Sequence, residues 1–309
     1  MELVRIDGAR TFSRSAPALA IGNFDGVHLG HQALVRATVE QARRQAGTAM
    51  VLTFDPHPVR VLAPERAPRA LMTLEQRAEL LSALGIEVVA VLGFDADVAA
   101  LDPEQFVRAI LVRTLEARSV VVGERFRFGR GRAGDVSLLA RLGDECGFNV
   151  RAHPVVVEEG EPVSSSRIRE LLALGDVQGA ARLLGRAFFV DGTVVRGDGR
   201  GRLIGIPTAN LETRNETLPA PGVYAGFAHI ASGGERWPAV VNLGERPTFA
   251  GSGLRLEAHL LDYDGELYGR ELRLEFTRRL RDERRFGSAA ELVEQIRRDV
   301  ADARASLEL

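Results

Sequence analysis

The sequence predicts two domains: a doubly wound α/β sheet of mostly parallel strands, then a mostly antiparallel β domain that ends in a helix. The chain has 309 residues, about twice the roughly 150 residues of one domain. Between residues 18 and 160, short apolar runs alternate with amphipathic segments, as in βαβ units. After Gly185 the runs alternate in polarity and are separated by Gly, Asn, Asp or Pro, which is typical of an antiparallel barrel or sandwich. We therefore expect domains at 1–184 and 185–309.

Five apolar runs of the first half have the length of buried strands: Ala18–Gly22, Ala49–Phe54, Val88–Gly93, Ser119–Gly123 and Asn149–Val157. The helices expected in this half are 32–45, one from the capping box Thr73/Gln76 to Gly85, Glu104–Ala117 after Asp102-Pro103, 168–174 and 177–184. Ligands of such sheets bind beyond the carboxyl ends of the strands, where the chain order switches direction. The loops at those ends are therefore the first places to look for a site.

The stretch Ile21–His31, IGNFDGVHLGH, lies between the first predicted strand and its helix. Its glycines permit tight turns and close approach to a ligand. A helix N-terminus offers unpaired N–H groups and partial positive charge to a phosphate. His28 and His31 are three residues apart, so both can reach one point and stabilise charge that develops on a phosphoryl group. A surface turn with two histidines is the alternative for HxGH alone.

Three further segments of the first half are candidate ligand contacts. The loop TFDPHP contains His57 and Pro58, and VGERFRFGR contains Arg125; both suit a pocket for a flat heteroaromatic, although the second is equally typical of a solvated turn. In SSSRIR, the hydroxyls of Ser164 and Ser165 and the guanidinium of Arg169 suit nucleotide phosphates. Serines before an apolar run are also ordinary N-caps, so both interpretations stay open.

The second half contains a Gly- and Arg-rich loop, Gly197–Asn210, that suits phosphate binding or a plain hairpin. On an extended segment Thr208 and Asn210 face the same way, and their oxygens could hold a hard cation such as Mg²⁺. Glu257, in an alternating strand, is a candidate general base or a rim carboxylate paired with an arginine. The strands expected here are Ala187–Val195, Val223–Ile230, Trp237–Asn242, Leu254–Asp262 and Glu271–Leu280, before a helix whose capping box is Ser288/Glu291.

Composition excludes several classes of protein. The net charge is −2, which gives no electrostatic case for a nucleic-acid partner. All 40 basic residues are arginine, so Walker A and Schiff-base lysines are excluded. No apolar run approaches the ~20 residues that span a bilayer, and the N-terminus has no signal core. We expect a cytoplasmic monomer or weak oligomer with small-molecule substrates, no membrane partner, and a single cysteine, Cys146, that packs rather than reacts.

Taken together, the motifs resemble the prokaryotic bifunctional riboflavin kinase/FAD synthetase family over nearly the whole chain. GNFDGVHLGH, TFDPHP, VGERFRFG and SSSRIR are similar to its HxGH nucleotidyltransferase-like adenylyltransferase module. GRLIGIPTANL, PGVYAG, VVNLGERPTF, EAHLLDYDGELYG and RLRDERRF are similar to its riboflavin kinase module, a β-barrel. The resemblance implies that ATP phosphorylates riboflavin to FMN and then adenylylates FMN to FAD.

The resemblance also implies roles for individual residues. In the first module, His28, His31 and Arg169 would be catalytic, and the nucleotide and flavin contacts would be Gly22, Asn23, Phe24, Asp25, Gly30, His57, Pro58, Arg125, Ser164 and Ser165. In the second, Glu257 would be the base, Thr208 and Asn210 would bind Mg²⁺ and ATP, and the other contacts would be Gly197, Gly205, Pro207, Arg281 and Glu283. Arg125 departs from the family pattern, and either contacts FMN or obstructs its pocket. An active kinase module alone, or another HxGH nucleotidyltransferase, are the alternatives.

Overall fold

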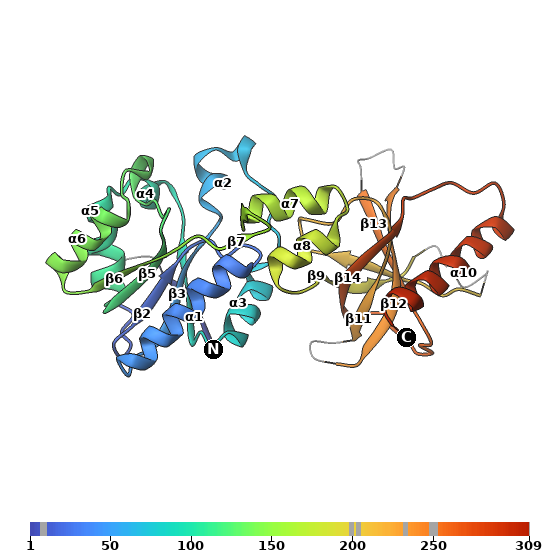
Figure 1. Cartoon of the computed structure of the whole chain (residues 1–309), viewed down its shortest axis with the longest axis horizontal. Coiled ribbons are helices and arrows are strands. Elements are labelled where there is room, and N and C mark those ends of the chain that lie inside the picture. The colour runs from blue at the N-terminus through green and yellow to red at the C-terminus, as the bar shows by residue number, and fades with distance from the viewer. Residues whose placement is uncertain (7–10, 198–200, 202–204, 231–233, 247–252, 309) are drawn as a thin grey trace. The chain divides into compact units, whose positions relative to one another are not determined.

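The computed structural model describes the chain except residues 7–10, 198–200, 202–204, 231–233, 247–252 and 309. The chain folds into two compact units, Met1–Ser164 and Ser165–Leu309 (Figure 1). Each unit contains its own sheet and its own apolar core. The predicted boundary after residue 184 lies inside the second unit, because the two helices that precede it in the chain pack with that unit.

The first unit is built on a six-stranded sheet with parallel pairing throughout, in the order β1-β4-β3-β2-β5-β6. Its strands are β1 (Glu2–Ile6), β2 (Ala18–Ile21), β3 (Ala49–Asp55), β4 (Val88–Gly93), β5 (Ser119–Gly123) and β6 (Asn149–His153). The predicted strands are therefore confirmed, except that the last ends at His153. Beyond it, a separate hairpin pairs β7 (Val157–Glu158) with β8 (Glu161–Pro162). The edge strand β1 was not predicted, because it is mostly exposed and so shows no apolar run.

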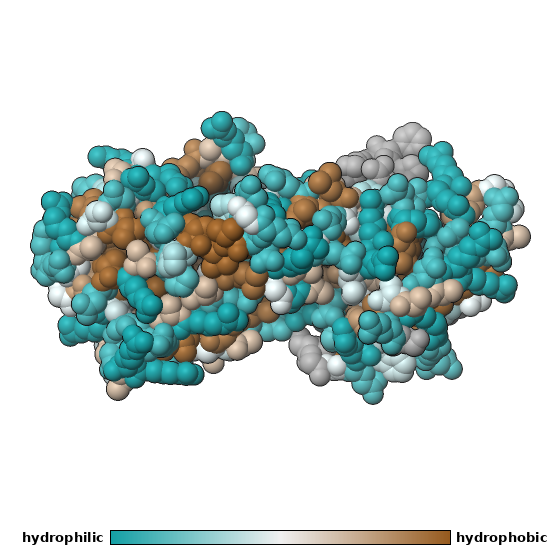
Figure 2. Space-filling model, in the orientation of Figure 1, coloured by the Kyte–Doolittle hydropathy of each residue, from teal (hydrophilic) through white to brown (hydrophobic). Residues whose placement is uncertain are grey.

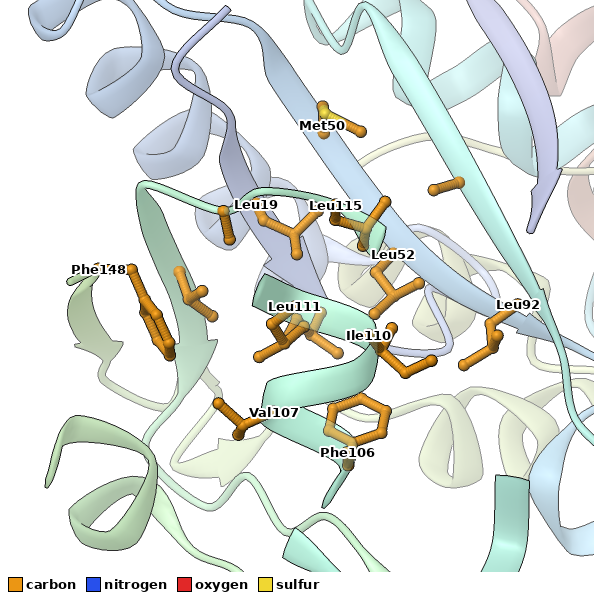
Figure 3. Close-up of a cluster of buried hydrophobic side chains, with 14 of the residues drawn as sticks. Leu19, Met50, Leu52, Leu92, Phe106, Val107, Ile110, Leu111, Leu115 and Phe148 are labelled. Atoms are coloured by element: carbon orange, nitrogen blue, oxygen red, sulfur yellow. The ribbon is translucent and has the colours of Figure 1, made fainter. Parts of the chain in front are cut away.

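Helices cover both faces of this sheet (Figure 1). They are α1 (Leu29–Arg44), α2 (Pro58–Leu62), η1 (Pro64–Arg66), α3 (Leu74–Ala83), α4 (Ala96–Ala100), α5 (Pro103–Phe106), η2 (Val107–Thr114), η3 (Arg130–Arg132) and α6 (Val136–Cys146). The capping boxes of α3 and α5 are present, the first as predicted, and the segment after α5 continues as a π-helix. Apolar residues of α1 and α3 pack on one face, and those of α5, η2 and α6 pack on the other (Figure 3).

The strand order places a topological switch point between β2 and β5. The chain leaves β2 through α1 for β3 on one side, whereas β5 leads to β6 on the other side. Crevices at such points are where ligands of doubly wound sheets bind. The loop Gly22–His28 follows β2 directly, so the predicted fold class and the predicted place of this loop are both confirmed.

The second unit is a closed antiparallel barrel in the order β10-β13-β12-β11-β14-β9, with one helix after it. Its elements are α7 (Ser165–Ala173), α8 (Val177–Leu184), β9 (Phe188–Val195), β10 (Ala209–Thr213), β11 (Gly222–Ile230), β12 (Arg236–Arg246), β13 (Gly253–Leu260), β14 (Glu271–Arg281) and α10 (Ala289–Ser306). Because this sheet is closed, the second unit is a barrel and not a sandwich. The short strand β10 was not predicted, and α7 begins three residues before the predicted helix, so Ser165 is helical.

Alternate residues of the barrel strands face its interior and its outside. Leu256, Ala258 and Leu260 of β13 are buried, whereas the residues between them are half-buried. Ser288 caps α10 as predicted, but Glu291 accepts a hydrogen bond from the N–H of Gly287 rather than from that of Ser288. Part of the outer face is covered by α10, through a cluster that includes Val223, Val240 and Ala303. On the face shown in Figure 2, hydrophilic residues cover most of both units.

Candidate active sites

The two histidines of HxGH lie together at the start of α1. His28 is the N-cap of the helix, and its Nδ1 accepts a hydrogen bond from the N–H of His31 at 3.3 Å. The two rings stack with centroids 3.6 Å apart and planes 16° apart. Because Nδ1 of His28 is an acceptor, its neutral ring carries the proton on Nε2. The helix start therefore presents N–H donors to any anion beyond the end of β2.

Backbone geometry around the histidines depends on two glycines. A Cβ on Gly30 would lie 3.1 Å from Cε1 of His28 and 3.9 Å from the carbonyl oxygen of Val163. A Cβ on Gly22 would lie 3.3 Å from the ring of Phe24. Phe24 and Val27 have φ of 50° and 39°, values that side-chain-bearing residues seldom adopt and that occur at functional sites when the surroundings enforce them. The loop is thus held in one conformation by packing.

His31 is kept neutral. Burial, then His28, then Arg77 lower the pKa of His31 well below its usual value. Its Nδ1 is buried and has no hydrogen-bond partner among the described residues. The ring lies against Phe24, with centroids 5.1 Å apart. A neutral imidazole keeps one N–H, so His31 can donate a hydrogen bond to a ligand without carrying a charge.

The β3–α2 loop is joined to the β2–α1 loop by a side-chain hydrogen bond. The Asn23 amide lies 3.0 Å from Nε2 of His57, and Nδ1 of His57 accepts from the N–H of Val59 at 3.2 Å. Nδ2 of Asn23 is the atom that faces Nε2 of His57. This contact joins the loop after β2 to the loop after β3. Pro58 is the first residue of α2.

The other predicted residues of the first site differ in their setting. Asp25 is 3% exposed, and both carboxylate oxygens accept from the N–H of Leu71, so it shapes the loop from below. Arg125 is exposed in the turn after β5, beside the stacked rings of Phe126 and Phe128. Ser164 ends the first unit, directly after Val163. Ser165 and Arg169 lie on α7, in the second unit.

A second set of predicted residues meets on the outer face of the barrel. Asn210 of β10 pairs directly with Glu257 of β13, and Glu257 pairs on its other side with Asn242 of β12. Residues directly opposite each other in a sheet share a face, so these three side chains form one row. Arg255 connects two of them: its Nε donates to Oδ1 of Asn210 at 3.1 Å, and its Nη2 lies 3.0 Å from Oε1 of Glu257.

The segment around Thr208 connects this row to a pocket at one end of the barrel. Half-buried Thr208 and Asn210 flank buried Ala209, which agrees with their predicted shared face. Nδ1 of His259 bonds the carbonyl oxygen of Pro207 at 2.7 Å. A Cβ on Gly197 would lie 2.2 Å from Nδ2 of Asn210, so a larger residue there would displace the Asn210 side chain. Gly205 has φ of 76°. The pocket is lined by residues that include Val194, Pro207, Thr208, Ala258, Leu260, Tyr263 and Tyr268.

Arg281 and Glu283 lie at the far end of the same row. Asn242 and Arg281 both pair with Val223 of β11, one on each side, so Arg281 continues the row. Its guanidinium forms a bidentate ion pair with Asp299 of α10, at 2.9 and 2.7 Å. The Glu283 carboxylate lies so close to Gly244 of β12 that a Cβ there would be 2.4 Å from Oε1. Glu283 therefore approaches the Asn242–Glu257 row, whereas the guanidinium of Arg281 fastens α10 to the barrel.

Sequence reasoning missed Arg77 and Arg255 as parts of these sites. Arg255 stands two residues before Glu257, so the period of the strand places both on one face, and that signal was available. Nothing comparable marks Arg77, because only the packing of α3 against β3 brings it to Thr53. Among the described residues, no group of three or more His, Cys, Asp or Glu side chains could hold a metal ion.

The chain thus combines a histidine pair at a helix N-terminus of a doubly wound sheet with a closed barrel that sets a carboxylate opposite an amide. This combination is the class of two-domain protein that the sequence predicts, with a nucleotidyltransferase-like sheet and a kinase barrel. Two protein-family models match the chain. The family described as FAD synthetase matches residues 12–167, and the family described as riboflavin kinase matches residues 184–307. The bifunctional riboflavin kinase/FMN adenylyltransferase of Escherichia coli K12 is 40% identical over 98% of this chain and 97% of its own.

Similar matches come from other bacteria. The relative of the same name from Pseudomonas fluorescens is 40% identical over 99% of this chain and 97% of its own, and that from Bacillus subtilis is 37% identical over 92% and 90%. A crystal structure described as a macrolide-efflux protein from Streptococcus pneumoniae superposes with a TM-score of 0.90 at 30% identity, over 98% of this chain and 99% of that chain. No described helix is long and apolar enough to cross a bilayer.

The chain therefore belongs to the family of bifunctional riboflavin kinases/FMN adenylyltransferases. It is an enzyme with both catalytic domains, and it converts riboflavin to FMN and FMN to FAD with ATP as the second substrate.

Proposed function

We propose that the loop after β2 is the centre of adenylyl transfer. The single observation that supports this is the stacked pair His28 and His31 at the N-terminus of α1. A phosphate oxygen of FMN attacks the α-phosphorus of ATP, the bond to the β-phosphate oxygen breaks, and pyrophosphate leaves. The attacking phosphate is already ionised, so no base is needed. Nε2–H of each histidine stabilises the charge that grows on the α-phosphoryl oxygens.

The remaining residues of the first site hold the substrates in our proposal. The ATP contacts are Gly22, Asn23, Gly30, His57 and Pro58. The predicted contacts Phe24 and Asp25 are buried, so in this proposal they support the loop and do not touch ATP. Ser164, Ser165 and Arg169 bind the pyrophosphate oxygens, which is the reason to assign residues 165–184 to the first functional domain although they pack with the barrel. The exposed Arg125 contacts FMN, since the turn after β5 opens at the same sheet edge as the histidine loop.

We place riboflavin phosphorylation at the outer row of the barrel. Glu257 accepts the proton of the terminal ribityl hydroxyl, whose oxygen attacks the γ-phosphorus of ATP while ADP leaves. Support comes from the register that sets Glu257 opposite Asn210, next to the segment with Thr208. The pocket with Tyr263 and Tyr268 beside Thr208 suits the adenine base. Gly197, Gly205 and Pro207 shape the phosphate loop, and Arg281 with Glu283 borders the flavin.

The donor set fits Mg²⁺. Thr208 and Asn210 offer neutral oxygen ligands, and Mg²⁺ is commonly held by few protein ligands together with substrate phosphates and water. When bound, the ion would neutralise charge on the transferred phosphate. Arg255, which holds Oδ1 of Asn210, has to release that oxygen for the cation. The side chains present therefore match a cation that arrives with ATP.

Two variants in the full-length protein test the two assignments. His28→Asn keeps an N-cap acceptor for α1 but removes Nε2, and Glu257→Gln keeps the shape but removes the base. Purified protein is supplied with ATP and Mg²⁺ and with riboflavin or FMN, and the flavins are separated by chromatography. We expect His28→Asn to lower FAD formation from FMN by about 10²–10³-fold, as loss of one charge-stabilising donor does. Glu257→Gln should lower FMN formation by about 10²–10⁴-fold, as loss of a general base does.

Each reaction is the control for the other variant. FMN formation by His28→Asn and FAD formation by Glu257→Gln should equal the parent rates. Loss of both reactions in either variant would contradict two separate sites. FMN as the sole product of the parent protein would instead support the alternative in which only the kinase is active. We further propose that the protein works in the cytoplasm as a monomer or weak oligomer. We also propose that it has no nucleic-acid partner, because a net charge of −2 gives no electrostatic case for one.

A further inference from the structure

The half-buried side chain of Arg77 has no role in the proposed reactions, although it points to the histidine loop. It lies on α3, on the helix face that packs against the carboxyl end of β3. Its Nη1 donates a hydrogen bond to Oγ1 of Thr53 at 3.1 Å, and Thr53 is fully buried. The Thr53 hydroxyl in turn donates to the carbonyl oxygen of Asn23 at 3.2 Å. This chain of hydrogen bonds joins α3 and β3 to the loop that carries the histidines.

The surroundings of Arg77 do not resemble a surface ion pair. Its Nε is buried and has no hydrogen-bond partner among the described residues. Asp25 and Asp55 stabilise its charge electrostatically, while burial opposes that charge and lowers the pKa of Arg77 from its usual value. A protein keeps such a costly buried cation where the charge has a use.

The charge of Arg77 acts on the histidine pair. The groups that act on His31 are His28 on its own helix and Arg77 from α3, and the carboxylates near Arg77 are Asp25 and Asp55. His57, from the start of α2, meets the same loop through Asn23. The positive charge of Arg77 therefore favours the neutral form of His31 and adds to the positive potential that an ATP phosphate meets.

We propose that Arg77 is a positioning residue for adenylyl transfer: through Thr53 it fixes the Asn23 backbone, and with it the loop that carries the histidine pair. This inference rests on the proposed role of the histidine pair. It extends that role to a residue that touches neither substrate, because Arg77 acts through Thr53 and through its field. Loss of the hydrogen bond would misplace the loop, and loss of the charge would let His31 take up a proton at higher pH.

Arg77→Met tests both effects, because methionine fills similar space without charge or donors. We expect kcat for FAD formation to fall by up to about 10²-fold, as misplacement of catalytic groups does. The acid-side decline of the rate should also move to higher pH. Arg77→Lys keeps the charge and should leave the acid-side decline at the parent pH while kcat stays low. Arg36→Met, which removes an exposed arginine from α1, is the matched control and should match the parent in rate and pH profile.

Riboflavin phosphorylation in the same molecule should be unchanged in every variant, because the kinase lies in the second unit. The thermal melt of the first unit reports whether that unit remains folded. If Arg77→Met does not fold, Thr53→Val separates the effects. It cuts the hydrogen-bond chain but keeps the charge, so kcat should fall without a shift of the pH profile. An Arg77→Met variant with parental kcat and parental pH profile would overturn the proposal. If His28→Asn also leaves FAD formation intact, the proposed function of the histidine pair itself is wrong.

Discussion

The ion pair between Arg281 and Asp299 gives a prediction whose size follows from the structure. Asp299 is 3% exposed at the side chain and Arg281 is 20% exposed, and the two are joined by hydrogen bonds of 2.9 and 2.7 Å. Nε2 of Gln295 also donates to Oδ1 of Asp299, at 2.8 Å. Asp299 thus joins α10 to the end of β14, and its replacement by Asn removes the charge but keeps one acceptor.

Removing one partner of a buried pair costs about 3–5 kcal/mol. We expect Asp299→Asn to lower the free energy of unfolding by less than that, about 2–3 kcal/mol, because Arg281 is partly exposed and Asn keeps one acceptor. With a urea m-value of about 2 kcal/mol/M, the unfolding midpoint should fall by about 1–1.5 M. Trp237, the one tryptophan of the chain, lies on β12 of the barrel and packs on Tyr263 with ring centroids 5.2 Å apart. Its fluorescence therefore reports unfolding of this unit alone.

Asp302→Asn is the matched control, because it makes the same change on an exposed position of α10. It should alter the free energy of unfolding by less than about 0.5 kcal/mol. If the two variants unfold within about 0.2 M urea of each other, the ion pair does not fasten α10, and the reasoning from burial is refuted. If the unfolding midpoint falls for Asp299→Asn while FMN formation stays normal, the role of this ion pair is structural.

Three further predictions concern the sites. Gly30→Ala puts a Cβ 3.1 Å from the His28 ring and should reduce FAD formation from FMN while FMN formation is unchanged; equal rates in the FAD assay would contradict it. Gly197→Ala puts a Cβ 2.2 Å from Nδ2 of Asn210 and should have the reverse effect, which riboflavin turnover measures; unimpaired phosphorylation would count against the Asn210 assignment. Folding lowers the pKa of His31, so only the unfolded histidine takes up a proton as the pH falls below about 6.5. The contribution of His31 to the free energy of unfolding is therefore complete above about pH 6.5 and is lost as the pH falls below it. His31→Asn should therefore flatten the fall of the melting temperature between about pH 7 and 5; an unchanged slope would refute this.

Much of the fold could be predicted because its signals are local. A strand followed by a glycine loop and a helix, the capping box at Thr73, and the end of α8 at Gly185 all depend on residues within a few positions of each other. β1 escaped detection because an exposed edge strand has no apolar run. β10 escaped because it is only five residues long and follows a Gly-rich loop.

Within the sites, the sequence by itself determined that His28 and His31 share the start of one helix and that a carboxylate lies in an alternating strand. Only the tertiary structure decided that Asn210 stands opposite Glu257, that Arg281 is engaged by Asp299, and that Arg77 reaches Thr53. Helix caps and strand periods arise from interactions between residues that are close in the sequence, so the spacing of residue types is enough to predict them. Strand register and buried charge pairs join residues far apart, and they are fixed only when the closed barrel and the packed sheet leave those side chains one arrangement.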